Sequence, residues 1–279
     1  MSSIASRGGR RALGALGVTA GVVLALAGCS SSSSSSSAAA PAPSATAPAP
    51  SATAATAPAA AGTAPGALPT ASMTPLPAAS GQLTGTQLES VLLPATDFPA
   101  GFATPTSGPI SSGGSLTSGP ATYNLATMSC ATFIQHLGAV GFGETAMVSG
   151  SVAASGQAYD ELIYQFGTAP AASAFVSGVQ ALAGRCGSFT ATANGSKGTF
   201  SLRATPGPAV GGHPSVELLQ TGTLGTSKLV LDTLLCASGV DVFAAAGVGV
   251  GGTAAPVQPT KDAVVYNLMK RQAAAVVLG

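Results

Sequence analysis

The sequence predicts an α+β fold: a mostly antiparallel sheet packed by about three to four helices, preceded by a signal peptide and a disordered tether. Two observations predict the sheet. Apolar residues recur with a period of two along several short segments, and these segments follow each other in runs instead of alternating with helices. A third observation is length, because residues 83–279 are enough to bury a core of their own.

Residues 1–28 predict a lipoprotein signal peptide. Three arginines lie within residues 7–11, an apolar run covers residues 12–27, and residues 26–29 read Leu-Ala-Gly-Cys. The apolar run is too short for a stable transmembrane helix. The closing residues resemble the lipobox of bacterial lipoproteins. This resemblance implies that Cys29 receives diacylglycerol, with palmitate as a further acyl chain, and begins the mature protein.

Two alternatives stay open for this signal. An ordinary secretory peptide with an incidental cysteine has the same general plan. The pair Arg10-Arg11 also matches the start of a twin-arginine export signal, although the residues that follow favour Sec export. With the lipid in place, we expect the chain to be held at the extracytoplasmic face of the cell membrane.

Residues 29–82 predict a disordered tether. Ser30–Ser37 are all serine, repeats of alanine, proline and threonine follow, and no charged residue occurs between Arg11 and Glu89. Proline favours extended backbone, and such small residues bury too little apolar area to offset chain entropy. We expect a spacer between the membrane and a folded domain at residues 83–279. The serine and threonine content leaves O-glycosylation open.

Four helices are predicted in this domain from caps, stops and apolar spacing. The first is short: it begins near Thr86, where Thr-Gln-Leu-Glu has the spacing of a capping box, and ends before Pro94. Apolar residues recur at helical spacing in the other three, Ala126–Val140, Pro170–Ala183 and Lys261–Val276. Proline at the start and glycine after the end mark the bounds of the third helix.

Seven segments are predicted as strands: Thr145–Ala153, Ala158–Phe166, Ser188–Ala193, Thr199–Ala204, Ser215–Thr221, Lys228–Ala237 and Val240–Ala246. The second of them shows the alternation most clearly, because every second residue from Leu162 to Phe166 is large and apolar. Gly156, Asn194-Gly195 and Ser238-Gly239 predict turns between consecutive strands.

The cysteines predict one disulfide. Lipidation of Cys29 leaves three cysteines in an oxidising compartment, which allows one intrachain bridge and one spare thiol. Cys130 lies in the second predicted helix and Cys186 directly follows the third, so we predict a bridge between them. It closes a loop of about 55 residues and contributes about 4 kcal/mol. Cys236 lies in an apolar strand as a small buried residue; a bridge in which it replaces one partner is the alternative.

The charge of the mature chain excludes several partners. Loss of residues 1–28 removes three of the ten basic residues, which leaves seven against nine acidic residues and a net charge of −2. This balance argues against binding to nucleic acid or to anionic lipid headgroups. We expect a monomer that reaches the membrane through its N-terminal lipid. Its ligand, a small molecule or another envelope protein, is not named by the sequence.

The glycines and histidines do not predict a nucleotide or metal site. Residues 247–252 match GxGxxG, but Pro256 and Pro259 follow at the place where a dinucleotide fold needs a helix. His136 lies alone in a predicted helix, and His213 lies in a Gly/Pro turn that we expect to be solvated. We therefore expect no cofactor and no metal.

The sequence also predicts no catalytic group. Neither GxSxG nor SxxK occurs. Asp160 and Glu161 are consecutive in a predicted strand, so their side chains point to opposite faces and cannot act as a pair. Asp232 and Asp241 can meet other carboxylates only through the fold. An envelope hydrolase with a site assembled from distant residues is therefore kept as an alternative.

Several short segments resemble one family. They are the stretch from Leu92 to Phe102, the sequence Tyr164-Gln165-Phe166 with Ala171, Ala174, Phe175 and Cys186 after it, and the strand Val240–Ala246 with its Gly-rich loop and C-terminal helix. Together they resemble the extracellular sensor domain of mycobacterial PknH-type Ser/Thr kinases and its free-standing lipoprotein relatives, over residues 83–275.

The resemblance implies an antiparallel sheet packed by helices, with a cleft that binds a ligand. Two features of this chain depart from the family. The family's tryptophan before the cysteine is replaced by Leu182-Ala183-Gly184-Arg185, and three cysteines cannot form the family's two disulfides. No ligand residue is carried over. The function expected is therefore a non-catalytic, ligand-binding or sensor-like lipoprotein, with an envelope protein–protein adaptor as the second alternative.

Overall fold

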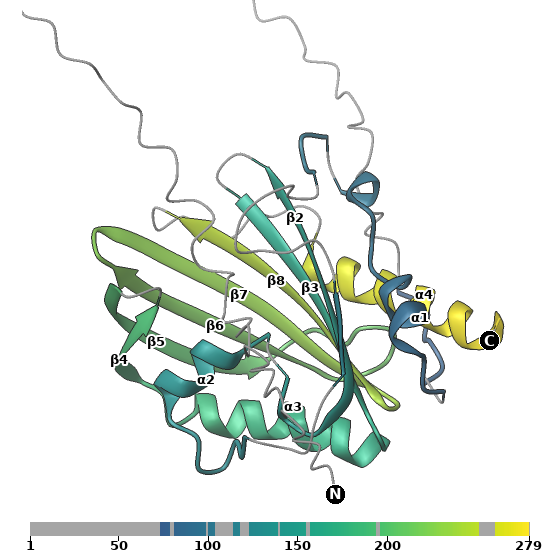
Figure 1. The fold of residues 1–279 in the computed structure, drawn as a ribbon, viewed down its shortest axis with the longest axis horizontal. Coiled ribbons are helices and arrows are strands. Elements are labelled where there is room, and N and C mark those ends of the chain that lie inside the picture. Colours follow the sequence, from purple (N-terminus) through teal and green to yellow (C-terminus); the bar gives the residue numbers. More distant parts are fainter. Residues whose placement is uncertain are drawn as a thin grey trace, which may run out of the picture.

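One antiparallel sheet of eight strands runs through the part of the chain that the structure describes (Figure 1). The structure is a computed structural model, and it describes residues 73–78, 81–98, 100–103, 114–117, 123–138, 140–154, 157–193, 196–250 and 260–278. The strands follow the order β1-β2-β3-β8-β7-β6-β5-β4, and each neighbouring pair is antiparallel. The signal peptide, Cys29 and the predicted turns at Gly156 and Asn194-Gly195 lie outside the described residues.

The predicted α+β class is confirmed. The strands are β1 Gly114–Thr117, β2 Glu144–Ala154, β3 Gln157–Phe166, β4 Ser188–Ala193, β5 Ser196–Pro206, β6 Ser215–Leu224, β7 Ser227–Ser238 and β8 Asp241–Val250. The helices are α1 Gly85–Glu89, α2 Cys130–His136, α3 Ala169–Ala183 and α4 Lys261–Leu278, with the short 3-10 helix η2 Ala95–Asp97 after α1. Every predicted strand is present within a few residues of its predicted bounds. β1 was not predicted, because its four residues Gly-Ser-Leu-Thr show no apolar alternation.

Helix α2 is shorter at both ends than the predicted helix Ala126–Val140. Oγ of Ser129 accepts a hydrogen bond from the backbone N–H of Thr132 at 3.1 Å, so Ser129 caps the helix and the residues before it lie outside. At the other end Leu137 has an extended backbone, and Gly138 has a φ of 88°. That left-handed conformation ends the helix and is easily adopted by glycine.

Helix α1 also begins and ends earlier than predicted. Its cap is Thr84, whose backbone N–H donates to Oε1 of Gln87 at 2.9 Å, so the capping box starts two residues before Thr86. The helix ends at Glu89. The apolar residues that follow, which include Val91, therefore lie in an irregular segment and are buried against the sheet.

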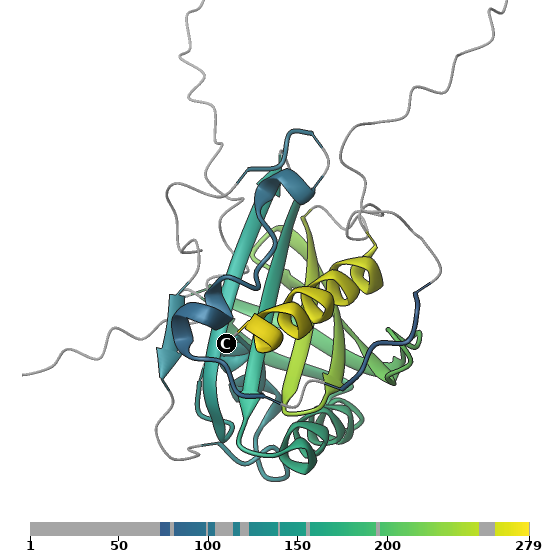
Figure 2. The ribbon, with the colours of Figure 1, turned by 90° about the vertical axis from the view of Figure 1, so that its right-hand side faces the viewer.

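Helices cover both faces of the sheet. α2 and α3 pack on one face, called the α3 face, and α1 and α4 pack on the other, called the α4 face (Figures 1 and 2). Even-numbered residues of β3, from Ala158 to Phe166, point to the α3 face, and the odd-numbered residues from Tyr159 to Gln165 point to the α4 face. β3 is therefore buried on both sides, which explains why apolar residues occur in both of its alternating sets.

Helix α4 is tied down near both of its ends. Nζ of Lys261, in the first turn, forms ion pairs with Glu217 at 3.2 Å and with Asp232. Near the other end, the guanidinium of Arg271 donates to the carbonyl oxygens of residues 90 and 91 at 2.7 and 2.8 Å. α4 thus joins the sheet to the segment that follows α1.

Residues 73–78, which the sequence assigns to the tether, lie against the domain. The backbone N–H of Leu76 donates to the carbonyl oxygen of Gly211 at 2.9 Å, and Nε2 of His213 lies 3.0 Å from the carbonyl oxygen of Leu76. His213 is therefore half-buried and hydrogen-bonded, not solvated as the sequence suggested. The hydroxyl of Tyr266 in α4 donates to a carbonyl oxygen of the same segment at 3.2 Å. Contacts with the domain thus begin before its predicted boundary.

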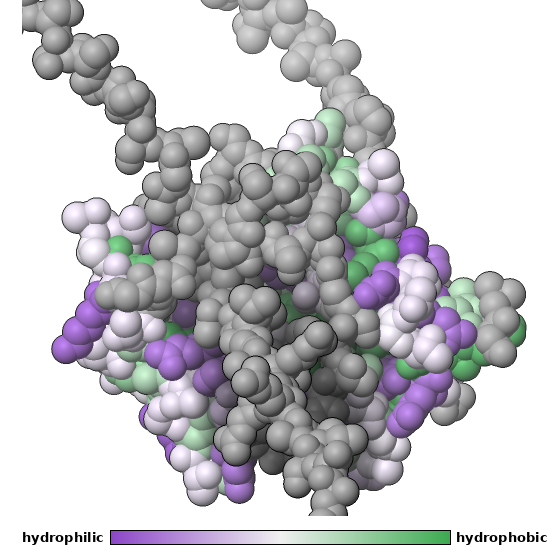
Figure 3. All heavy atoms as spheres, viewed as in Figure 1, coloured by the Kyte–Doolittle hydropathy of each residue, from purple (hydrophilic) through white to green (hydrophobic). Residues whose placement is uncertain are grey.

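The described surface is weakly charged. Pale, weakly polar residues dominate the coloured part of the face in Figure 3, with hydrophilic side chains scattered among them, as expected from a charged content of 7%. Val277 of α4, 84% exposed, is the large hydrophobic side chain that stands out as exposed among the described residues.

Candidate functional site

An apolar cavity lies between α2 and the α3 face of the sheet. It is lined by the end of α2 and by the middle of four strands, and its volume is about 40 Å³. The lining residues are Ile134, Leu137, Gly138, Asp160, Leu162, Tyr164, Gln220, Leu231, Thr233, Leu235, Ala244 and Ala246. Aliphatic side chains make up most of this lining, and the polar groups come from four residues only.

The register of the sheet explains why there is space at this point. Ala246 of β8 lies between Asp160 of β3 and Thr233 of β7 in one cross-strand row. Ala244 lies two residues away on β8 and points to the same face. Two alanines side by side on one face leave room above the sheet that larger neighbours on β3 and β7 enclose. The floor of the cavity is thus built by β8.

Asp160 is the ionisable group at the edge of this floor. Its side chain is buried, with the residue 3% exposed, and Oδ1 accepts a short hydrogen bond from Oγ of Ser151 on β2. Oδ2 is buried and has no hydrogen-bond partner. Burial raises the pKa of Asp160 to about 6, although the bond from Ser151 lowers it. One carboxylate oxygen is therefore held in place by the protein and the other is free to accept a bond.

Thr233 supplies a second unpaired polar atom in the lining of the cavity. The residue is 2% exposed, and its Oγ1 has no hydrogen-bond partner. The side chain of Gln220, on the neighbouring strand β6, is also buried and lines the same space. Tyr164 is different, because its hydroxyl accepts a hydrogen bond from the backbone N–H of Gly138 at 2.9 Å. Burial raises the pKa of Tyr164, so its hydroxyl stays neutral.

Unpaired buried polar atoms are rare in native proteins, because each costs about 1–3 kcal/mol if it stays without a partner. Here two such atoms, Oδ2 of Asp160 and Oγ1 of Thr233, lie in residues that line one cavity. An apolar pocket with a few convergent polar groups is the usual form of a small-molecule site. The arrangement can hold a hydrogen-bonding ligand or a few water molecules.

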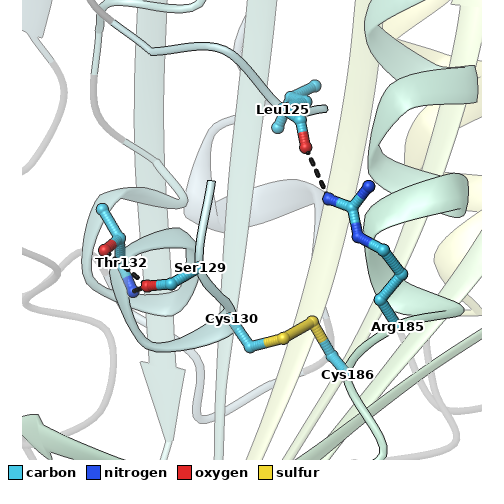
Figure 4. The surroundings of a disulfide bond; sticks show 6 residues. All are labelled: Leu125, Ser129, Cys130, Thr132, Arg185 and Cys186. Carbon is cyan, nitrogen blue, oxygen red and sulfur yellow. Dashed lines mark hydrogen bonds between the residues drawn. A yellow bond between two sulfur atoms is a disulfide. The ribbon is translucent and has the colours of Figure 1, made fainter. Parts of the chain in front are cut away.

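A disulfide fixes the roof of the cavity. Cys130, the first residue of α2, is bonded to Cys186, with 5.6 Å between their Cα atoms (Figure 4). This is the predicted pairing, and Cys236 is the buried free cysteine on β7. Close by, the guanidinium of Arg185 donates to the carbonyl oxygen of Leu125 at 2.9 Å. Both connections hold the segment that carries α2 against the end of α3.

The other candidate residues lie elsewhere. Glu161 points to the α4 face, as predicted from the strand, and its Oε2 accepts from the backbone N–H of Leu93 at 2.9 Å. Burial raises the pKa of Glu161 to about 8. Asp232 forms the ion pair with Lys261, and Asp241 lies under α4. The structure therefore brings none of these three carboxylates to the cavity.

The histidines and the glycine motif do not form a site either. His136 stacks against Tyr123, with 4.5 Å between ring centroids, and Nδ1 lies 3.1 Å from the tyrosine hydroxyl. Gly247 and Gly249 are paired residues of β8, so the described part of the GxGxxG match, residues 247–250, is strand and not a phosphate-binding loop. Within the described ranges, no three His, Cys, Asp or Glu side chains gather closely enough to hold a metal ion.

Sequence reasoning missed Asp160 and Thr233 as cavity residues. A signal for both was present: each is a polar residue inside a set of apolar residues that point to the same face, Ala158 and Leu162 around Asp160, and Leu231 and Leu235 around Thr233. A polar residue in such a position is either paired or functional. That the two belong to one row became visible only from the strand order.

No helix among the described residues has the length and apolar character needed to cross a membrane. No protein-family model matches the chain, and no curated protein matches its sequence.

Solved structures that are similar to the chain include two from mycobacteria. The extracellular domain of PknH from Mycobacterium tuberculosis shares 13% identity, covers 70% of this chain and 98% of its own length, and has a TM-score of 0.48. The Rv0999 ortholog from Mycobacterium smegmatis shares 9% identity, covers 68% of this chain and 96% of its own length, and has a TM-score of 0.36.

Proposed function

We propose that this chain is a lipid-anchored, extracytoplasmic binding protein whose cavity under α2 holds a small ligand without transforming it. The observation that carries this proposal is the pair of buried, unpaired polar atoms in the apolar cavity, Oδ2 of Asp160 and Oγ1 of Thr233. A bound group that makes hydrogen bonds removes the cost of leaving them without partners.

Two further observations support the proposal. The disulfide holds α2 over the cavity, so the space is preformed and a ligand does not have to order its own site. The Leu-Ala-Gly-Cys sequence that ends at Cys29 supports anchoring by a lipid at the extracytoplasmic face of the membrane. In a sensor role, the ligand-bound protein would in addition be recognised by another component of the cell envelope.

The test uses a variant that fills the cavity. Ala246→Leu adds three heavy atoms to its floor and leaves Asp160 and Thr233 in place. Ala181→Leu makes the same change at an exposed position of α3 and is the matched control. Native mass spectrometry of protein purified from the cell envelope should show a bound small molecule on the wild type and on Ala181→Leu, but not on Ala246→Leu. A bound mass that persists on Ala246→Leu, or no bound mass on any protein, contradicts the proposal.

A further inference from the structure

We propose that the ligand carries a primary ammonium group, which binds above Ala246 between Asp160 and Thr233, with its apolar chain along the leucine walls of the cavity. This inference rests on the proposed function, since it names the chemistry of the ligand of the same site.

The strand order places two acceptors on one face of the sheet, on either side of β8. Asp160 and Thr233 are on strands separated only by β8, in the row that contains Ala246. Neighbouring strands are about 4.8 Å apart, so the two backbones lie about 10 Å apart. Their side chains rise from the same face, one on each side of the alanine. A nitrogen bound above Ala246 therefore has a candidate acceptor on each side.

The atoms that lack partners fit an ammonium group. An ammonium has three N–H donors and no acceptor. Oδ2 of Asp160 accepts one bond and Oγ1 of Thr233 accepts a second, and both residues are more than nine-tenths buried. Gln220, in the adjacent row of the same lining, carries a side-chain oxygen that can accept the third. The buried carboxylate also gains an opposite charge, which offsets the loss of its hydration.

The lining disfavours the other common ligand charges. The described residues of the lining include no lysine, arginine or histidine, so a carboxylate or phosphate would face Asp160 without a counter-charge from them. A neutral alcohol has one donor and gains no ion pair. The volume of about 40 Å³ is room for roughly three water molecules. It suits a headgroup with the first few carbons of its chain, which the side chains of Leu162, Leu231 and Leu235 surround.

The charge state of Asp160 makes the affinity for an ammonium group depend on pH. Burial raises its pKa to about 6, and Ser151 donates to it from β2. Tyr164 is the other titratable group of the lining, and Glu161 next to Asp160 points to the opposite face. An ammonium needs the ionised carboxylate. Its affinity should therefore fall by about tenfold from pH 7 to pH 5, whereas an alcohol should show no such loss.

The experiment compares n-propylamine, n-propanol and propionate, which share the same chain length and differ in the polar group. Binding to the full-length protein is measured by calorimetry and thermal shift at pH 7 and pH 5. We expect propylamine to bind at least tenfold more tightly than propanol at pH 7, and propionate not to bind. Asp160→Asn should lose at least tenfold in affinity for propylamine and keep its affinity for propanol.

Thr233→Val removes the second acceptor without changing the shape, and it tests the inference if Asp160→Asn does not fold. Equal affinity for the amine and the alcohol, or unchanged amine binding by Asp160→Asn, overturns the inference. The proposed function has a separate readout. If all three probes bind and Ala246→Leu abolishes all binding, the cavity is a ligand site of different specificity. If no probe binds and no mass co-purifies, both proposals are wrong.

Discussion

Nε2 of Gln272 on α4 donates a hydrogen bond to Oδ2 of Asp241 on β8, and both side chains are completely buried. Oδ1 of the same carboxyl has no hydrogen-bond partner. Burial raises the pKa of Asp241 from 3.8 to about 7, although the hydrogen bond from Gln272 lowers it. The C-terminal helix is thus held by a carboxyl group that resists ionisation.

We predict that Asp241→Asn stabilises the protein at pH 8 and has less effect at pH 5. Between about pH 4 and pH 7 the unfolded chain releases a proton that the native state still holds, so the free energy of unfolding falls as pH rises through this window. Asparagine keeps the shape and cannot ionise. The expected gain at pH 8 is roughly 2–4 kcal/mol, measured by urea unfolding.

Glu144→Gln is the control for this prediction. In the wild type, the carboxylate of Glu144 accepts hydrogen bonds from the backbone N–H groups of Gly141 and Phe142 at 2.7 and 2.8 Å, so both of its oxygens are already paired. The amide has one acceptor only, and this variant should be destabilised at both pH values. If Asp241→Asn is destabilised as much at pH 8 as at pH 5, the carboxyl stabilises the native state and our interpretation is wrong.

A separate prediction concerns Gly222 of β6, where there is no space for a larger side chain. A Cβ atom at this position would lie 2.4 Å from Cδ1 of Phe200 and 2.8 Å from the carbonyl oxygen of Thr199. Gly222→Ala should therefore lower the free energy of unfolding by about 1–3 kcal/mol, because the ring of Phe200 has to move. Gly187→Ala is the matched control, since nothing lies within 4 Å of its Cβ position. Equal stability of the two variants would show that the ring adapts at no cost.

Removal of the disulfide should loosen the roof of the cavity. The variant with Cys130→Ser and Cys186→Ser loses a bridge between residues 56 positions apart, and we expect it to lose about 2–4 kcal/mol in urea unfolding. Reduction of the wild type should produce the same loss, because Cys236 forms no bridge. We also expect the variant to bind any ligand of the cavity under α2 with lower affinity than the wild type. Unchanged urea midpoints for both the variant and the reduced protein would contradict this.

The lipid anchor is tested by Cys29→Ala. The thiol of Cys29 is the proposed site of diacylglycerol, so we expect the variant to appear in the soluble fraction of envelope preparations. Ser30→Ala changes the neighbouring residue without removing the thiol and should stay with the membrane. Continued membrane fractionation of Cys29→Ala would mean that the chain is held in another way.

The sequence predicts the elements better than the site, for physical reasons. Alternation of apolar residues is a local property, and it locates β2 and β3 within one residue at each end. Helix ends depend on individual caps, and α1 starts at the capping box of Thr84 and Gln87, two residues before the start expected at Thr86. The site depends on the order of strands, because Asp160 and Thr233 are 73 positions apart and meet only through Ala246 of β8.

The β3–β8 ladder also sets the order in which this fold can assemble. β4 to β8 form a meander in which each strand pairs with the next one along the chain. In the β3–β8 ladder the partners are 76 to 92 residues apart, from Gln165 with Asp241 to Gln157 with Gly249. Closing so long a loop is entropically costly, and contacts of this kind slow folding. The cavity floor spans this ladder, so the binding site should be among the last parts to form.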